Sequence, residues 1–222
     1  MVSAAVDVPT SGYGPGQTID VSALPVDVFD WRSPVWWGNL LAILIETTTL
    51  ALLVTSYFYL KRNFSEWPPP KVEVFPPIYR PVPELTWPTI NLVLLVLSCV
   101  PMYLTDVAAR RKNRMGTLLG LLVIFLVAVA ATFIRFREFP GIHFKWNDNA
   151  YGSVVWWMLA THLTYILAAG AEFLILFFWV LTHKLDESHA LDVTLGGGYW
   201  YWVAGTWVVV YVVVYWSARM MS

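Results

Sequence analysis

Five long, continuously apolar segments restrict what this chain can fold into. They occupy residues 36–60, 87–104, 118–136, 154–181 and 199–216. A helix needs about 20 mainly apolar residues to cross the hydrocarbon core of a bilayer, and these segments are at or near that length. Their apolar residues are consecutive and do not alternate, as the strands of an outer-membrane barrel would. The sequence therefore predicts an all-α integral membrane protein, a bundle of five transmembrane helices.

The composition supports the same class. Hydrophobic residues make up 58% of the chain and charged residues 13%, whereas a soluble domain has about 25% charged residues. A water-soluble fold is thereby excluded. The formal net charge is −1, so no excess of basic charge indicates binding to nucleic acid.

Basic residues in the loops predict how the bundle lies in the membrane. Arg110, Arg111, Lys112 and Arg114 form the densest basic cluster of the chain, between the second and third segments. Short loops rich in Lys and Arg stay on the cytoplasmic side. With five spans, the N-terminus is then inside and the C-terminus outside.

One transmembrane domain is expected over residues 35–218, preceded by a flexible tail over 1–34 without the pattern of a cleaved signal peptide. Eight prolines between residues 66 and 88 predict an extended surface strap after the first span. Residues 183–198 end in three glycines and are expected to form a short loop before the fifth span.

Few ionisable side chains lie within the apolar segments, and each one suggests a functional role. Glu46 is near the middle of the first span, His162 and Glu172 are in the fourth, and Arg135 and Glu138 lie where the third span ends. An Asp, Lys or Arg at the centre of a membrane helix costs about 2.5 to 3.5 kcal/mol on insertion. Glu46, Glu138, His162 and Glu172 are therefore candidate polar sites.

Two interpretations of Glu46 remain open from the residues alone. Its carboxyl could belong to a proton relay or contact a lipid headgroup or a partner subunit. It could also be a neutral, hydrogen-bonded structural group, because burial in hydrocarbon disfavours the charged form. The three threonines that follow Glu46 can bond backbone carbonyls one turn back.

The sequence contains no motif typical of a redox-metal site or of an enzyme active site. The four histidines are scattered over two loops and one helix, and the single cysteine, Cys99, lies in an apolar segment. Metal and haem sites need several ligands at close spacing. Phosphate-binding, dinucleotide-binding and nucleophile-elbow motifs are also missing. We expect no catalytic residue, no metal ligand and no bound cofactor in this chain.

Three groups of motifs resemble the last five helices of the cytochrome c oxidase subunit III family. In order, they are Glu46 in the first span with Trp-Pro-Pro at 67–69, Glu138 with Asn-Ala-Tyr-Gly-Ser at 149–153 and His162, and Tyr-Trp-Tyr-Trp at 199–202 with Tyr-Trp at 215–216. The order and spacing over about 180 residues carry the resemblance.

This chain departs from the family pattern at three positions. Tyr165 occupies the place of a second family histidine, and Tyr201 and Ala204 occupy places where a histidine and an aspartate are common. Many members have seven helices, and five-helix forms occur among bacterial oxidases. The chain resembles a divergent five-helix form.

The resemblance implies a non-catalytic subunit III of a haem-copper terminal oxidase in the bacterial inner membrane. Such a subunit packs against subunit I, accompanies subunit II and in some complexes subunit IV or a respiratory supercomplex, and leaves haem and copper to its partners. It binds phospholipid and sustains proton uptake by a proton-translocating complex in aerobic electron transport. Glu46, Glu138, His162 and Glu172 would then be polar residues of a lipid cleft or a subunit interface.

Two alternatives stay open. One keeps the family but places the chain in a quinol oxidase or beside a nitric oxide reductase. The other is a small proton-coupled transporter that uses Glu46 and Glu172. A transporter would show inverted repeats or helices broken near mid-membrane, and the spans here are mostly unbroken.

Overall fold

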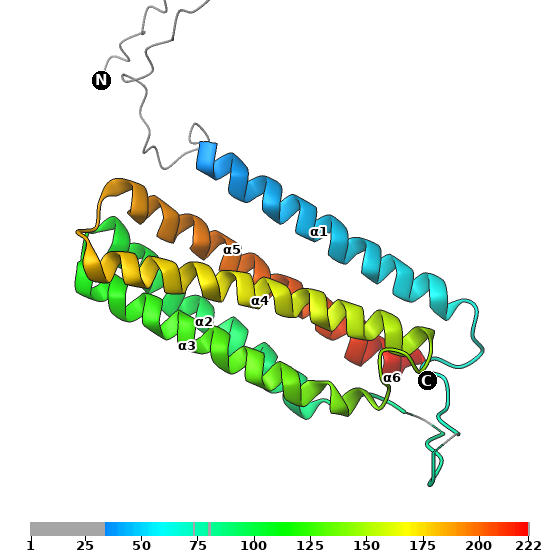
Figure 1. Ribbon diagram of the computed structural model, residues 1–222. Helices are drawn as coiled ribbons and strands as arrows, with labels where there is room; N and C mark the ends of the chain where they lie inside the picture. The colour runs from blue at the N-terminus through cyan, green and yellow to red at the C-terminus, as the bar shows by residue number, and fades with distance from the viewer. Residues whose placement is uncertain (1–33, 73, 80, 222) are drawn as a thin grey trace, which may run out of the picture.

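The computed structural model describes residues 34–72, 74–79 and 81–221 (Figure 1). Its long helices are α1 Pro34–Lys61, α2 Thr86–Arg110, α3 Arg114–Glu138, α4 Ala150–Thr182 and α5 Glu187–Tyr211, and a 3₁₀ turn, Pro140–Ile142, follows α3. After α5 the chain continues through a π-helical turn, Val212–Trp216, into α6, Ser217–Met221. Five helices in this described part are long and apolar enough to cross a membrane. The predicted all-α bundle of five spans is confirmed, and its orientation stays a prediction.

Helices α2 to α5 form the body of the bundle, and α1 lies along its flank against α4 and α5 (Figure 1). The core consists mainly of side chains from α2, α3, α4 and α5. Along α1 only Leu50 and Tyr57 are fully buried. One side of α1 is therefore open to whatever surrounds the chain.

The fifth helix begins at Glu187, twelve residues before the predicted 199, so the expected glycine loop is wrong. The Asp186 side chain accepts the backbone N–H of His189 at 2.9 Å and caps the helix. That hydrogen bond holds the pKa of Asp186 below its ordinary value. Gly196 lies inside α5, at a position where an added Cβ would come within 2.9 Å of the Glu172 carboxyl. The glycine permits close helix packing.

Polar caps also start two other helices earlier than the apolar pattern indicated. The side chain of Asn113 accepts the N–H of Gly116, and α3 begins at Arg114, four residues before the predicted 118. The side chain of Asn149 accepts the N–H of Gly152 in the same way, at the start of α4. Hydropathy locates the membrane core of a helix and misses its polar first turn.

The proline-rich strap folds over one end of the bundle. Trp67 is buried there, with its ring 5.1 Å from that of Tyr151. The Lys71 ammonium donates to the Asp148 carboxylate at 3.0 Å and to the carbonyl of His143 at 2.7 Å. The backbone N–H of Lys145 and the Lys71 ammonium hold the pKa of Asp148 below its ordinary value. The strap is thereby tied to the loop between α3 and α4.

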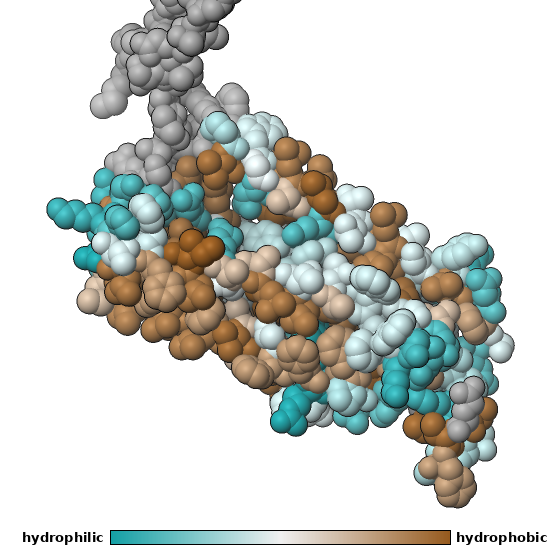
Figure 2. Space-filling model, viewed as in Figure 1, coloured by the Kyte–Doolittle hydropathy of each residue, from teal (hydrophilic) through white to brown (hydrophobic). Residues whose placement is uncertain are grey.

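The molecule has two polar ends and an apolar middle. The α2–α3 and α4–α5 turns lie at one end, and the strap, the α3–α4 loop and α6 lie at the other (Figure 1). Figure 2 shows hydrophobic residues along the sides of the helices and most hydrophilic ones towards the ends. This distribution fits a bundle that spans a bilayer.

Candidate functional site

Glu46 lies midway along α1, on the side that faces α4 and α5. The hydroxyl of Tyr199, on α5, donates to its carboxyl at 2.7 Å. The hydroxyl of Tyr165, on α4, donates to its backbone carbonyl at 3.1 Å. Both tyrosines are nearly buried. Two neighbouring helices therefore hold the one acidic residue of α1 by hydrogen bonds at mid-membrane depth.

The threonines after Glu46 behave as the sequence indicated. Thr47, Thr48 and Thr49 each donate a hydroxyl hydrogen to a carbonyl one turn back, at 2.6 to 3.0 Å. Thr47 also accepts a hydrogen bond from the indole N–H of Trp202 at 2.9 Å. This contact adds a second polar link between α1 and α5, one residue along from Glu46.

A groove of about 590 Å³ lies between α1, α4 and α5, towards the end where α1 begins. Glu172 and Asp192 line it from α4 and α5, and Gly38 and Asn39 line it from α1. Asn39 donates to the carbonyl of Leu195 at 3.3 Å, which fixes this end of α1. The groove is open to the outside, and apart from Glu172 and Asp192 most of the residues that line it are apolar.

Glu138 belongs to a second, fully enclosed site inside the bundle. Its carboxylate forms an ion pair with the Arg135 guanidinium, one turn back on α3, and accepts a hydrogen bond from the Asn91 amide of α2 at 2.9 Å. Arg135 also donates to Nδ1 of His162, on α4, at 3.0 Å. The exposed fraction is 2% for Glu138 and 0% for the other three. The cluster joins three helices out of contact with lipid.

The geometry of this cluster fixes the protonation state of His162. Its Nε2 lies 3.0 Å from the carbonyl oxygen of Val203, which can only accept, so Nε2 carries the hydrogen. Nδ1 then accepts from Arg135, which is always a donor. His162 is therefore neutral, Arg135 and Glu138 balance each other, and the Trp207 ring covers the guanidinium at 3.7 Å.

The four predicted site residues thus separate into two groups. Glu46 and Glu172 lie along the interface of α1 with α4 and α5, whereas Glu138 and His162 lie in the bundle interior. Sequence reasoning missed Asn91 and Trp207 as members of the enclosed site. Arg135 was noted where the third span ends but was not among the candidate site residues. Its spacing of three residues from Glu138 could have indicated the pair, since side chains at that spacing meet on a helix.

No metal-binding group of three or more His, Cys, Asp or Glu side chains occurs among the residues that the structure describes. Cys99 lies in α2, with its thiol 3.6 Å from the carbonyl of Leu95. The described sites can form hydrogen bonds between helices, and their carboxyl groups can hold a proton.

Comparison with known proteins gives a consistent match. The family model described as cytochrome c oxidase subunit III matches residues 32–219. The protein named cytochrome c oxidase subunit 3 from Trichophyton rubrum is 28% identical over 152 residues, which cover 68% of this chain and 54% of the relative. The protein of the same name from Papio hamadryas is 24% identical over 150 residues, which cover 68% of this chain and 55% of the relative. The protein of that name from Vanderwaltozyma polyspora is 22% identical over 184 residues, 81% of this chain and 66% of the relative. The chain spans about half the length of the first two.

Proposed function

Because the chain belongs to the cytochrome c oxidase subunit III family, we propose that it is the accessory subunit III of a haem-copper terminal oxidase. The supporting observation is the family match, which extends over residues 32–219 and so covers all five spanning helices. The proposed complex couples aerobic electron transport to proton translocation. Its haem and copper would be bound by partner subunits.

The proposed role is to stabilise subunit I and to sustain its proton uptake, with subunit II, and in larger assemblies subunit IV or a supercomplex, as further partners. The open side of α1 supports this role, because a helix that crosses a membrane with few buried side chains has surface left for a neighbour. Glu46 and Glu172 are the proposed polar residues facing a phospholipid or a subunit. Glu138 and His162 are proposed to brace the bundle from inside.

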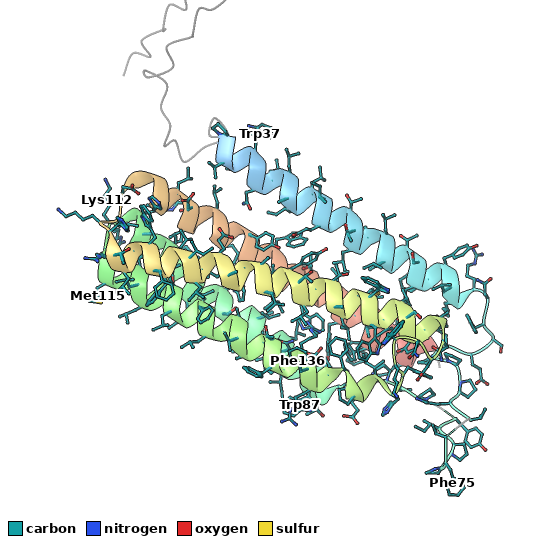
Figure 3. The ribbon with its side chains drawn as sticks, in the orientation of Figure 1. Trp37, Phe75, Trp87, Lys112, Met115 and Phe136 are labelled. Atoms are coloured by element: carbon teal, nitrogen blue, oxygen red, sulfur yellow. The ribbon has the colours of Figure 1, made fainter. Side chains whose placement is uncertain are left out.

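The proposed placement is one transmembrane domain over residues 35–218 in a bacterial inner membrane, with the N-terminus inside. Residues 1–33 of the predicted tail are not among the described residues. Pro34, the last residue of the predicted tail, is the first residue of α1. The basic residues at the α2–α3 turn lie at the same end as the start of α1 (Figure 1). Labelling of single cysteines placed at Lys112 and at Phe75, on opposite ends in Figure 3, in a chain with Cys99→Ala, tests the orientation.

Removal of this chain from the oxidase is the test of the proposed function. We expect the haem and copper spectra of the remaining complex to be largely unchanged, while its turnover decays faster than that of the complete complex. The measurement is oxygen consumption over repeated turnovers beside an absorption spectrum. Loss of all haem from an otherwise assembled complex would contradict an accessory role.

Exchange of Glu46 to Gln is expected to leave assembly intact and to change sustained turnover or lipid retention only modestly. A glutamine carbonyl still accepts the hydrogen bond from Tyr199, so the docking of α1 persists. Glu46→Leu removes that acceptor and is expected to loosen α1, measured as faster proteolysis of the α1–α2 strap. Collapse of the complex with Glu46→Gln would instead favour a purely structural carboxyl.

The electron donor follows from the partner that copurifies. A subunit II with a two-copper domain would identify cytochrome c as the donor, and a subunit II without one would favour the quinol-oxidising alternative.

A further inference from the structure

The proline-rich strap carries a loop whose apolar side chains lie outside the core of the bundle. This strap loop comprises residues 71–72 and 74–79 of the described chain. The exposed fraction is 100% for Phe75, 69% for Tyr79 and 60% for Val72. Phenylalanine is among the residue types most often buried, and exposed apolar side chains that gather in one place mark interaction sites. The strap loop is therefore a candidate contact surface.

Hydrogen bonds hold the base of the strap loop in one shape. The backbone N–H of Lys71 donates to the carbonyl of Ile78 at 2.8 Å, and the N–H of Ile78 donates to the carbonyl of Lys71 at 2.9 Å. The Lys71 ammonium also ties this base to Asp148 and to the carbonyl of His143, in the α3–α4 loop. A loop that is ordered before binding loses less conformational entropy in a complex. Phe75 is thus presented from a preorganised support.

The tip of the strap loop lies outside the expected hydrocarbon layer. In Figure 3, Phe75 lies beyond the ends of the long helices and farther along the bundle than Trp87, the second residue of α2. Tryptophan near the end of a span is typical of the headgroup layer. An apolar side chain beyond that layer meets water unless another protein covers it. This position favours a protein over a lipid tail as the ligand of Phe75.

A hollow of about 560 Å³ adjoins the strap loop. Lys71 and Val74 of the loop line it, together with Lys145 and Asp148 of the α3–α4 loop. Asp148 already accepts hydrogen bonds from the Lys71 ammonium at 3.0 Å and from the backbone N–H of Lys145 at 2.9 Å. The exposed side chain of Lys145 forms no hydrogen bond or ion pair within the described part of the chain. Two lysines and one aspartate leave the wall of the hollow with one positive charge in excess.

We propose that the strap loop and this hollow form a docking site for the extramembrane domain of a partner protein. Phe75 enters an apolar pocket of that domain, and a carboxylate beside the pocket pairs with Lys145. Aromatic side chains dominate the energetics of protein interfaces, and a charge next to them selects a partner surface of opposite sign. The partner surface is therefore acidic around an apolar pocket. This docking requires that the strap end of the bundle lies outside the membrane, and it is independent of the oxidase assignment.

Photo-crosslinking of the full chain in cells that make it natively tests the docking. The photoreactive amino acid p-benzoylphenylalanine replaces Tyr79, so that Phe75 and Lys145 remain available for substitution. We expect one dominant product, whose crosslinked peptide, identified by mass spectrometry, belongs to an extramembrane segment of another protein and contains Asp or Glu. Phe75→Ala should lower its yield about tenfold or more, as truncation of a central interface residue does. Phe133→Ala removes a similarly exposed ring, 68%, from α3 and should leave the yield unchanged.

Charge variants test the part assigned to Lys145. Lys145→Glu should lower the yield of the crosslink about tenfold, because it places like charges opposite each other, whereas Lys145→Arg should keep the yield. Lys184→Glu, at an exposed lysine at the opposite end of the bundle, is the matched control and should leave the yield unchanged. Exchange of the partner's carboxylate for lysine should restore the yield with Lys145→Glu, since the pair is then reversed. Yields are compared at equal amounts of the chain in the membrane.

Four results would overturn the docking. The first three are crosslinks to lipid alone, crosslinks only to a second copy of this chain, and products spread over many proteins without an effect of Phe75→Ala. The fourth is an equal yield with Lys145→Glu and Lys184→Glu. A single crosslinked partner that is not an oxidase subunit would support the docking and count against the proposed function alone, so the two failures are distinguishable.

Discussion

Replacement of Arg135 by methionine is expected to lower the stability of the chain by about 3 to 5 kcal/mol, the usual cost of removing one partner of a buried ion pair. Glu138 would be left in the bundle interior, 2% exposed, without its positively charged partner, although the Asn91 amide would still donate to it. His162 would lose the donor to its Nδ1. The measurement is thermal or denaturant unfolding of the purified full chain in mild detergent.

Two further variants separate the ion pair from the general effect of losing an arginine. Arg137→Met removes a neighbouring exposed arginine and is expected to change stability little. The double variant Arg135→Met with Glu138→Met is expected to recover much of the loss, because apolar side chains of similar volume often replace a buried pair without cost. A stability of Arg135→Met within about 1 kcal/mol of wild type would contradict the proposed bracing role.

Gly120→Ala is the second substitution with a large expected effect. A Cβ at this position of α3 would lie 2.0 Å from the hydroxyl oxygen of Thr105 and 2.8 Å from its Cβ, on α2. Thr105 is buried and donates to the carbonyl of Pro101 at 2.7 Å. Rotation of its side chain would leave its Cβ in place, so rotation alone cannot relieve the contact. Small residues let membrane helices approach closely. Overpacking here should cost about 1 to 3 kcal/mol.

Gly205→Ala provides the control on α5. An added Cβ there meets no atom within 4 Å, so the substitution should keep or raise stability, since alanine favours a helix over glycine by about 1 kcal/mol. The same unfolding measurement compares the two variants. If Gly120→Ala and Gly205→Ala gave the same unfolding midpoint, α2 and α3 would not be in the close contact described here.

The five spans were predictable because each one leaves a long apolar signal in a local stretch of sequence. The helix ends were harder to predict, because single polar side chains such as Asp186 and Asn149 set them. The glycines at 196–198 were misassigned to a loop for a related reason. Gly196 and Gly197 admit Glu172 and Met102 from other helices, whereas an added Cβ at Gly198 would meet no atom within 4 Å. No local pattern in the sequence indicates such a contact between helices.

The candidate residues were identified from their cost in a membrane, and their partners were not. Asn91 and Glu138 are separated by 47 residues, and Arg135 and His162 by 27. Packing of the whole bundle decides which faces of the helices meet and form hydrogen bonds. For the same reason Tyr199 was noticed as part of an aromatic motif, and its hydrogen bond to Glu46 became visible only in the structure.

The flanking position of α1 has a consequence for the biogenesis of the protein. This helix is synthesised before the four other long helices described here, and its hydrogen-bond partners Tyr165 and Tyr199 follow Glu46 by 119 and 153 residues. At about 5 to 20 residues per second, the ribosome needs roughly 8 to 30 s to supply the second of them. During that interval Tyr199, the described hydrogen-bond donor to the Glu46 carboxyl, has not yet been made. Insertion of α1 therefore precedes its docking, and a chaperone or insertase that shields one carboxyl for seconds would speed maturation.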